Sequence, residues 1–249
     1  MTAHDLTSRL ATLTPSRVRL DGSGGPAPMR AVLDFQASHA RARDAIHSAV
    51  DWPSLAAALN PLPTLRLRSR ATDRAIYIRR PDLGRVLDQQ DEALVLAAPC
   101  DLCLVVADGL SAAAVMKQAA GLVHALRRAL PGLTFGPVAL VQGGRVAIGD
   151  EIASRMGARL CLTLIGERPG LSVADSLGAY LTFAPRSGMP DSARNCVSNI
   201  HGNGGLTHDV AAGRLVWLIR AAMERGMTGV GLKDESSGAP DALGKEEVA

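Results

Sequence analysis

An uninterrupted apolar segment, Leu-Cys-Leu-Val-Val at residues 102–106, constrains the fold more than any other part of the sequence. A strand with one wet face alternates apolar and polar side chains, whereas a strand covered on both faces is apolar throughout. Two further apolar segments follow at residues 138–141 and 160–165, with helical spacing between them. Strands that alternate with helices form a parallel sheet with right-handed crossovers. The sequence therefore predicts an α/β fold with a Rossmann-like parallel sheet.

Capping residues mark the helices that accompany these strands. Ser111 and Thr207 carry hydroxyl groups that cap helix N-termini, and Gly157 favours the left-handed conformation that ends a helix. We expect helices at residues 112–130 and 148–156 and a long helix from Thr207 to about Gly226. A fourth strand is expected at residues 177–183, and a long loop at residues 185–205.

The part of the chain before residue 98 has a different pattern and is expected to form a smaller, mainly helical N-terminal domain. Apolar residues recur at helical spacing over residues 29–50, whereas residues 64–80 alternate apolar residues with arginines, as in a two-stranded ribbon. Pro81 and Asp82 then open a further expected helix that reaches about residue 97. The predicted division is a mainly helical region with a loop at residues 21–28 and a short β ribbon (1–97), a Rossmann-like α/β domain (98–235) and a mobile tail (236–249).

Composition narrows the class of protein. Of 249 residues, 47% are hydrophobic but only 3% are aromatic, so the core has to be built mainly from aliphatic side chains. The formal net charge is +3 and the arginines are scattered, so nucleic acid is not expected as a partner. The sequence shows no secretory signal and no apolar run of about 20 residues, and most of its cysteines lie in or beside apolar segments. We therefore expect a cytoplasmic protein without a membrane partner.

Two polar loops are the first candidates for a binding site, because ligands of such sheets bind outside the carboxyl ends of the strands. One loop is the Gly-Glu-Arg-Pro-Gly motif at residues 166–170, in which proline stiffens the segment around Glu167 and Arg168. Its glycines suggest that a ligand comes close to the backbone. The alternative is that both charged side chains only cap neighbouring backbone or face water. The other loop, at residues 195–201, is dense in small polar groups and is expected to reach the same edge.

Catalytic and metal-binding interpretations of the second loop have weak support. Cys196 and His201 can form a nucleophile and its base, but the sequence shows no partner that would orient them. Cys196, His201 and His208 lack the paired ligand spacing of structural zinc sites. No catalytic residue and no metal ligand is therefore predicted in this chain.

Three other patterns have structural explanations beside functional ones. Cys100 and Cys103 have the spacing of a thiol redox motif, but they lie before and within an apolar strand and not at a helix N-terminus. The Gly-Asn-Gly-Gly segment at residues 202–205 precedes a helix without directly following a strand, which weakens a dinucleotide-binding interpretation. His39 and Arg43 share one face of the first helix, either as a solvated stripe or as a contact surface for another chain.

Seven short motifs occur in order along the chain. They are His-Ala-Arg-Ala-Arg-Asp (39–44), Tyr-Ile-Arg-Arg-Pro-Asp-Leu-Gly (77–84), Ala-Asp-Gly-Leu-Ser (107–111), Gly-Arg-Val (144–146), Gly-Glu-Arg-Pro-Gly-Leu (166–171), Asp-Ser-Leu (175–177) and Cys-Val-Ser-Asn-Ile-His (196–201). Each motif alone is short, but seven in register are specific. Taken together over residues 18–231, they resemble the small (light) subunit of ethanolamine ammonia-lyase, an adenosylcobalamin-dependent enzyme.

This resemblance implies a carbon–nitrogen lyase that converts ethanolamine to acetaldehyde and ammonia by a radical mechanism. A large partner subunit with a barrel fold would bind the substrate and carry the catalysis, while this chain completes the site of adenosylcobalamin. Carried over by motif, the cofactor contacts would be Val146, Glu167 and Cys196. The family also implies a cytoplasmic hetero-oligomer that can be packaged in a bacterial microcompartment. The competing hypothesis is a stand-alone α/β binding or regulatory module for a nucleotide-like ligand.

Overall fold

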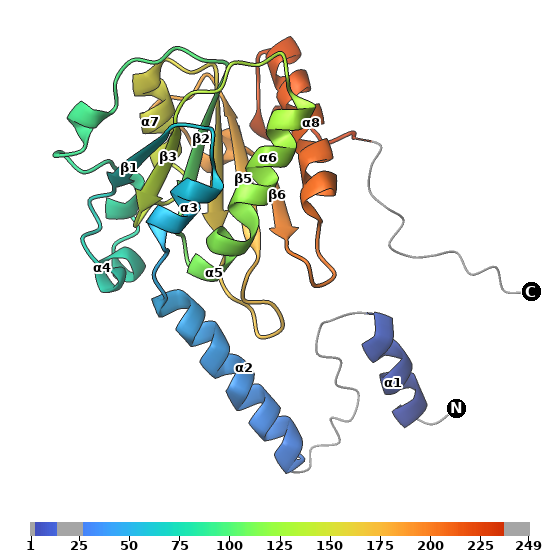
Figure 1. The fold of residues 1–249 in the computed structure, drawn as a ribbon. Coiled ribbons are helices and arrows are strands. Elements are labelled where there is room, and N and C mark those ends of the chain that lie inside the picture. Colours follow the sequence, from blue (N-terminus) through green and yellow to red (C-terminus); the bar gives the residue numbers. More distant parts are fainter. Residues whose placement is uncertain (1–2, 14–26, 237–249) are drawn as a thin grey trace, which may run out of the picture.

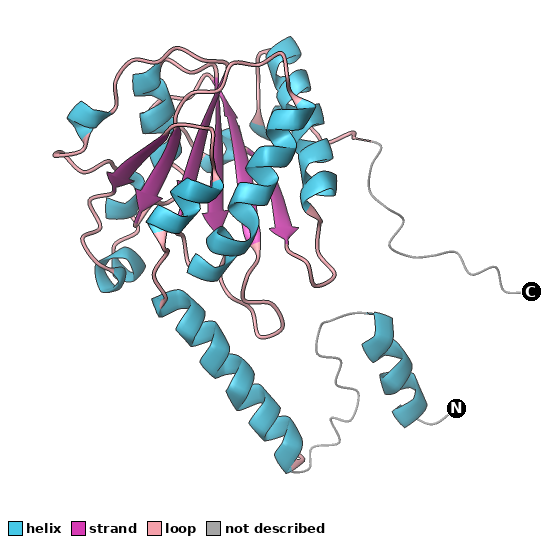
Figure 2. Cartoon of the chain, in the orientation of Figure 1, coloured by secondary structure: helices cyan, strands magenta, loops and turns pink. Residues whose placement is uncertain are grey.

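The structure is a computed structural model that describes residues 3–13 and 27–236 of the chain. In these residues a mixed sheet has helices packed against both faces (Figure 1, Figure 2). Its strand order is β1-β3-β2-β4-β5-β6. The strands are β1 (Thr64–Arg68), β2 (Leu102–Ala107), β3 (Val138–Gln142), β4 (Leu160–Gly166), β5 (Leu177–Phe183) and β6 (Asn195–Ile200).

Most of the expected helices are present, with ends close to those predicted. Ser111, Gly157 and Thr207 act as helix caps in the predicted way. A π-helical turn, η3 (Val115–Ala119), joins α5 and α6 into one long helix. The α-helices are α1 (Ala3–Leu13), α2 (Met29–His47), α3 (Trp52–Ala58), α4 (Arg74–Arg79), α5 (Ala112–Ala114), α6 (Ala120–Ala129), α7 (Ile148–Met156) and α8 (His208–Arg225).

The apolar sequence of β2 has the predicted consequence, because both faces of this central strand are buried. Leu102, Leu104 and Val106 belong to the core on the face covered by α3, α5, α6 and α8. Cys103 and Val105 belong to the core on the other face, which α7 covers. Full burial of one such branched side chain contributes about 1.5–3 kcal/mol, so the alternating residues of β2 hold both layers of helices to the sheet.

The parallel sheet predicted from the sequence is confirmed for β2, β3 and β4 and is wrong for β5, the fourth predicted strand. β1, β3, β2 and β4 run parallel, but β5 pairs antiparallel with β4 and β6 antiparallel with β5. A parallel connection needs a long crossover, usually through a helix. Residues 167–176 between β4 and β5 form no helix, so the chain turns back on itself.

The long loop expected at residues 185–205 contains the edge strand β6. Only Val197 and Ile200 of this strand are buried, and its other side chains include Asn195, Cys196 and Asn199. An edge strand with such a polar sequence carries little of the apolar alternation that marks strands. The existence of β6 was therefore not visible in the sequence.

The ribbon expected at residues 64–80 is wrong. Its first half is β1, which joins the main sheet as a parallel neighbour of β3. Its second half is helix α4, and Asp73 caps this helix by accepting a hydrogen bond from the Ile76 amide at 2.8 Å. Asp73 is thus a helix-capping residue rather than part of a hairpin turn. β1 precedes residue 98, so the sheet draws strands from both of the predicted domains, whose division itself stays a prediction.

The helix expected from Pro81 to about residue 97 is also wrong. The segment contains only two short 3₁₀ turns, η1 (Leu83–Arg85) and η2 (Glu92–Leu94), because it runs along the outer edge of β1. Asp88 donates its amide to the Arg68 carbonyl at 2.9 Å, and the Asp91 carboxylate accepts from the Arg68 amide at 2.7 Å. The two bonds supply partners for the carbonyl and amide groups of Arg68 at the edge of the sheet. If residues 81–97 formed a helix, these groups would lack those partners.

Helix α2 extends away from the sheet and approaches it only with its C-terminal end (Figure 1). Met29 and Leu33 near its beginning are 71% and 55% exposed. None of the helices in the described part of the chain is long and apolar enough to cross a membrane. The loop expected at residues 21–28 and the tail expected at residues 236–249 lie largely outside the described residues.

Candidate functional site

Two cavities lie close together near the carboxyl ends of the parallel strands, with Tyr77 and Arg145 between them. Tyr77 lines the first cavity and Arg145 lines the second. The Arg145 guanidinium carbon lies 4.1 Å from the centroid of the Tyr77 ring, and Arg145 Nη2 donates to the Tyr77 carbonyl at 2.9 Å. This stacked pair therefore forms a common wall of both cavities.

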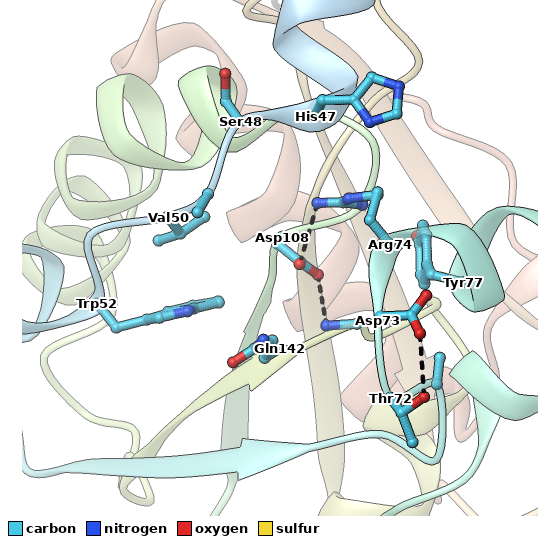
Figure 3. Close-up of a pocket in the computed structure, with 13 residues that line it drawn as sticks. His47, Ser48, Val50, Trp52, Thr72, Asp73, Arg74, Tyr77, Asp108 and Gln142 are labelled. Carbon is cyan, nitrogen blue, oxygen red and sulfur yellow. Dashed lines mark hydrogen bonds and ion pairs between the residues drawn. The ribbon is translucent and has the colours of Figure 1, made fainter.

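The first cavity has a volume of about 250 Å³ and lies outside the ends of β1, β2 and β3. Figure 3 shows its two sides. The Trp52 ring and Val50 lie on one side, whereas Arg74 and Asp73 lie on the other. The cavity thus has an apolar wall and a charged wall, an arrangement that suits a small ligand with an apolar part and a charged or polar part.

Asp108 is the most deeply placed acidic group of the first cavity, and it directly follows β2. Its carboxylate accepts a hydrogen bond from the Gly143 amide at 2.9 Å and forms an ion pair with Arg74 at 3.3 Å (Figure 3). Burial raises the pKa of Asp108 to about 6, and the charge of Arg74 and the backbone amides oppose that rise. A carboxyl group in this state can change its protonation near neutral pH.

The second cavity, of about 320 Å³, brings together two of the three predicted cofactor contacts. Val146 follows β3 and Cys196 lies on β6, some fifty positions further along the chain, yet both residues line this cavity. The antiparallel pairing of β5 and β6 makes this possible, because it sets Cys196 opposite Tyr180, which lines the cavity as well. The other lining residues are Arg85, Arg145, Ala147, Asp191 and Arg194.

Glu167, the third predicted contact, does not line the second cavity but lies beside it. Its Oε2 accepts hydrogen bonds from Ser176 Oγ at 2.5 Å and from the Asn199 amide at 3.3 Å. A Cβ atom on Gly178 would lie 3.0 Å from Glu167 Oε1 and 3.1 Å from the Tyr180 ring, so these two side chains meet over that glycine. The carboxylate is therefore held in one place, next to a residue of the cavity wall.

Three arginines that line the second cavity were not among the predicted site residues. Arg194 has a side chain that is only 2% exposed, and it forms an ion pair with buried Asp150 and another with Asp191 at 2.7 Å. Arg85 lies 3.6 Å from Asp191. The Nε atoms of Arg145 and Arg194 are buried without a hydrogen-bond partner in the described part of the structure. Arg145 occurs within the Gly-Arg-Val motif, but nothing in the local sequence marks Arg85 or Arg194.

The chemistry of Cys196 does not favour a nucleophile. Cys196 is an exposed residue of β6, but desolvation of its thiol by the surrounding groups raises the pKa, although a hydrogen bond with Tyr180 acts in the opposite direction. A thiol with a raised pKa stays protonated at neutral pH and is a poor nucleophile. His201 bonds instead with Asn199 Oδ1 at 2.7 Å and with the Asn203 amide at 3.1 Å. Among the described residues, no group of three His, Cys, Asp or Glu side chains could hold a metal ion.

Two of the other sequence patterns have structural explanations. Cys100 and Cys103 are buried, and Cys103 faces Cys161 across the β2–β4 pair in the core under α7. In the 202–205 turn, a Cβ on Gly205 would lie 2.4 Å from the Asn199 carbonyl oxygen. Glycine is therefore needed there for packing within the turn.

Comparison with known proteins gives one consistent result. The family model described as "Ethanolamine ammonia-lyase light chain (EutC)" matches residues 4–233. A protein of Bradyrhizobium diazoefficiens called "Ethanolamine ammonia-lyase small subunit" is 52% identical over 244 residues, which cover 94% of this chain and 93% of the relative. Proteins of the same name from Rhodopseudomonas palustris and Ralstonia nicotianae are 49% and 47% identical, over 94% and 90% of this chain and 92% and 87% of their own lengths.

Proposed function

Since the chain belongs to the ethanolamine ammonia-lyase light-chain family, we propose that it is the small subunit of an ethanolamine ammonia-lyase and completes a site for adenosylcobalamin. In this proposal the large subunit binds ethanolamine and carries the catalysis that yields acetaldehyde and ammonia. The sheet and its flanking helices act as a Rossmann-like support for the cofactor-binding loops. When bound, the cofactor supplies radical chemistry through homolysis of its cobalt–carbon bond, and this chain binds and orients it.

The observation that carries the proposal is the convergence of Val146, Glu167 and Cys196, which follow or lie on three different strands. The donors around them fit the group. A corrin ring carries carboxamide side chains, whose carbonyl oxygens accept hydrogen bonds and whose amide groups donate them. The second cavity offers guanidinium donors from Arg85, Arg145 and Arg194, and the carboxylate of Glu167 offers an acceptor at its side.

Each of the three residues has a role that its surroundings support. The Glu167 carboxylate, held by Ser176 and the Asn199 amide, would accept a hydrogen bond from a corrin carboxamide with its other oxygen, Oε1. Such a charge-assisted bond is stronger than one between neutral groups. Val146 and the protonated thiol of Cys196 would pack against the ring edge and contribute backbone contacts.

The proposed partner is the large subunit of the same enzyme. The three relatives described above are named small subunits, and α2 offers a surface that such a partner would cover. Met29, Val32 and Leu33 lie at helical spacing on one side of α2, and each is more than a third exposed. Most of the stability of a protein helix comes from the packing of its apolar side, so a protein that docks on this side of α2 would stabilise the helix.

The alternative, a stand-alone binding module for a nucleotide-like ligand, has less support. Its basis in the sequence is the parallel sheet together with the glycine-rich turn at residues 202–205, and packing within the turn explains Gly205. The first cavity offers an aromatic ring at Trp52 and charges at Arg74 and Asp108, but Gly143 is the one glycine among the described residues that line it. Packaging in a microcompartment stays a prediction from the family.

The direct test is co-expression of this chain with the large subunit, followed by purification with and without adenosylcobalamin. We expect the two chains to copurify, to retain the corrinoid spectrum together, and to release acetaldehyde from ethanolamine. A large subunit that makes acetaldehyde at the full rate without this chain would overturn the proposal. Retention of a nucleotide by this chain alone, with no corrinoid in any complex, would favour the alternative.

A further inference from the structure

Resting on the proposed function, we propose that Arg145 forms an anion subsite in the second cavity, which takes the phosphodiester of the cobalamin nucleotide loop. The three predicted contacts do not include this residue. The subsite would recognise the charged part of the cofactor, whereas Glu167, Val146 and Cys196 would recognise the corrin edge.

The distribution of charge around the second cavity is the main argument. Arg194 is matched by Asp150 and Asp191, and Arg85 lies within 3.6 Å of Asp191. Among the described residues, Arg145 has no carboxylate within ion-pair distance. It is held by one hydrogen bond to the Tyr77 carbonyl and by the Tyr77 ring. A half-buried guanidinium without a counterion would be stabilised by an anionic ligand that forms charge-assisted hydrogen bonds with it.

The position of Arg145 in the fold gives a second argument. Arg145, Val146 and Ala147 immediately precede α7, whose N-terminal end carries a partial positive charge. Two acidic residues of the first turn oppose this charge, but both are engaged elsewhere. Asp150 is paired with Arg194, and Glu151 accepts a hydrogen bond from the Leu87 amide at 3.0 Å and pairs with Arg155 at 3.1 Å.

The stacking of Arg145 on Tyr77 fixes the direction of the guanidinium. Gly84 also contributes, because its missing side chain leaves room for Arg145, whose Cγ would lie 2.8 Å from a Cβ at that position. A planar guanidinium fixed in this way can bind two oxygens of a phosphodiester side by side. A neutral carboxamide has a single acceptor oxygen and no formal charge, so it would match Arg145 less well.

Arg145 could bind an oxygen of the phosphodiester or an oxygen of a corrin carboxamide. Cobinamide distinguishes the two, because it keeps the carboxamides but lacks the nucleotide loop and its phosphodiester. Binding of cobalamin and of cobinamide to the assembled complex would be measured by equilibrium dialysis, with the corrinoid absorbance as readout. For Arg145→Gln we expect cobalamin to bind about 10- to 100-fold more weakly, since a charge-assisted contact is lost. Cobinamide should bind within about twofold of its wild-type affinity, because it makes no such contact.

The matched control is Arg220→Gln, which removes an exposed arginine of α8 and should change neither affinity. If Arg145→Gln does not assemble, Arg145→Lys keeps the charge, and its smaller loss should again be confined to cobalamin. In the wild-type complex, inorganic phosphate should compete with cobalamin and not with cobinamide.

Three results would overturn the subsite. These are unchanged cobalamin binding in Arg145→Gln, an equal loss for both corrinoids, and a lack of competition by phosphate. A wild-type complex that binds neither corrinoid would instead refute the proposed function itself, so the two failures can be told apart.

Discussion

Arg145 and Tyr77 come from opposite sides of the predicted domain boundary, yet the guanidinium of one stacks at 4.1 Å on the ring of the other. The contact couples the two cavities, because a change in either side chain alters the wall that they share. It also ties α4, which carries Tyr77, to the segment between β3 and α7. A ligand on either side of this wall would therefore meet a surface that the fold has already fixed.

Replacing Glu167 with glutamine should weaken cobalamin binding by the assembled complex about tenfold and leave the fold intact. The reason is that a charged acceptor becomes a neutral amide of nearly the same shape. Equilibrium dialysis with cobalamin measures the effect, and circular dichroism checks the fold. Glu224→Gln on α8 is the control, because Glu224 is exposed. An affinity equal to wild type would remove Glu167 from the site.

Breaking the buried ion pair of Arg194 and Asp150 should destabilise the chain strongly. Both side chains are 2% exposed, so Asp150→Asn leaves the buried charge of Arg194 with only exposed Asp191 as its counterion. We expect a loss of about 3 kcal/mol in the free energy of unfolding, measured by urea denaturation of the full chain. The double variant Asp150→Leu with Arg194→Met removes both charges and should be more stable than Asp150→Asn. A double variant that is less stable than the single one would contradict this account.

Asp108 should make a pH-dependent contribution to stability. Its pKa rises from 3.8 in the unfolded chain to about 6 in the folded one because of burial, so the folded state binds the proton more tightly. The contribution is therefore fully present below about pH 4 and is lost as the pH rises through about 6, an effect on the order of 3 kcal/mol. Relative to wild type, Asp108→Asn should thus gain stability between pH 4 and pH 7 in urea denaturation. A relative loss over that range would mean that Arg74 outweighs burial.

A charge on the exposed side of α2 should weaken assembly without unfolding the chain. Leu33→Asp places a carboxylate where the proposed partner would cover an apolar side chain that is 55% exposed in this chain. We expect at least about a tenfold weaker association with the large subunit, as for buried interface residues, and an unchanged melting temperature of the chain. Leu96→Asp is the control, because Leu96 is 73% exposed on a different segment. Equal effects of both variants on association would argue against α2 as the docking surface.

The sequence predicted the buried strands and the capped helices well because these elements follow from local rules. β2 is apolar throughout, and Ser111, Gly157 and Thr207 have conformational or hydrogen-bonding preferences that determine helix ends. The direction of β5 follows no such rule. It depends on whether residues 167–176 form a crossover helix, and the Glu-Arg-Pro-Gly sequence at their start is equally compatible with a binding loop and with a connection that turns back.

The predicted site residues came from family motifs. The structure adds further residues that line the same cavity but belong to no motif. Val146 and Cys196 line one cavity, but Arg85 and Arg194 reach it from segments with no motif of their own. Arg194 was not expected to be buried, since its partner Asp150 lies 44 positions earlier in the chain. Long-range ion pairs of this kind depend on the complete fold and leave no local pattern in the sequence.

The carboxylate of Asp91, which accepts the amide hydrogen of Arg68, also determines how the protein can join a larger assembly. Exposed strand edges recruit further strands from other molecules, and blocked edges do not. At this end of β1 the amide is already occupied, so neighbouring copies cannot extend the sheet through it. Close to this end of β1, we therefore expect contacts with other molecules to be made by side chains and not by the addition of a strand.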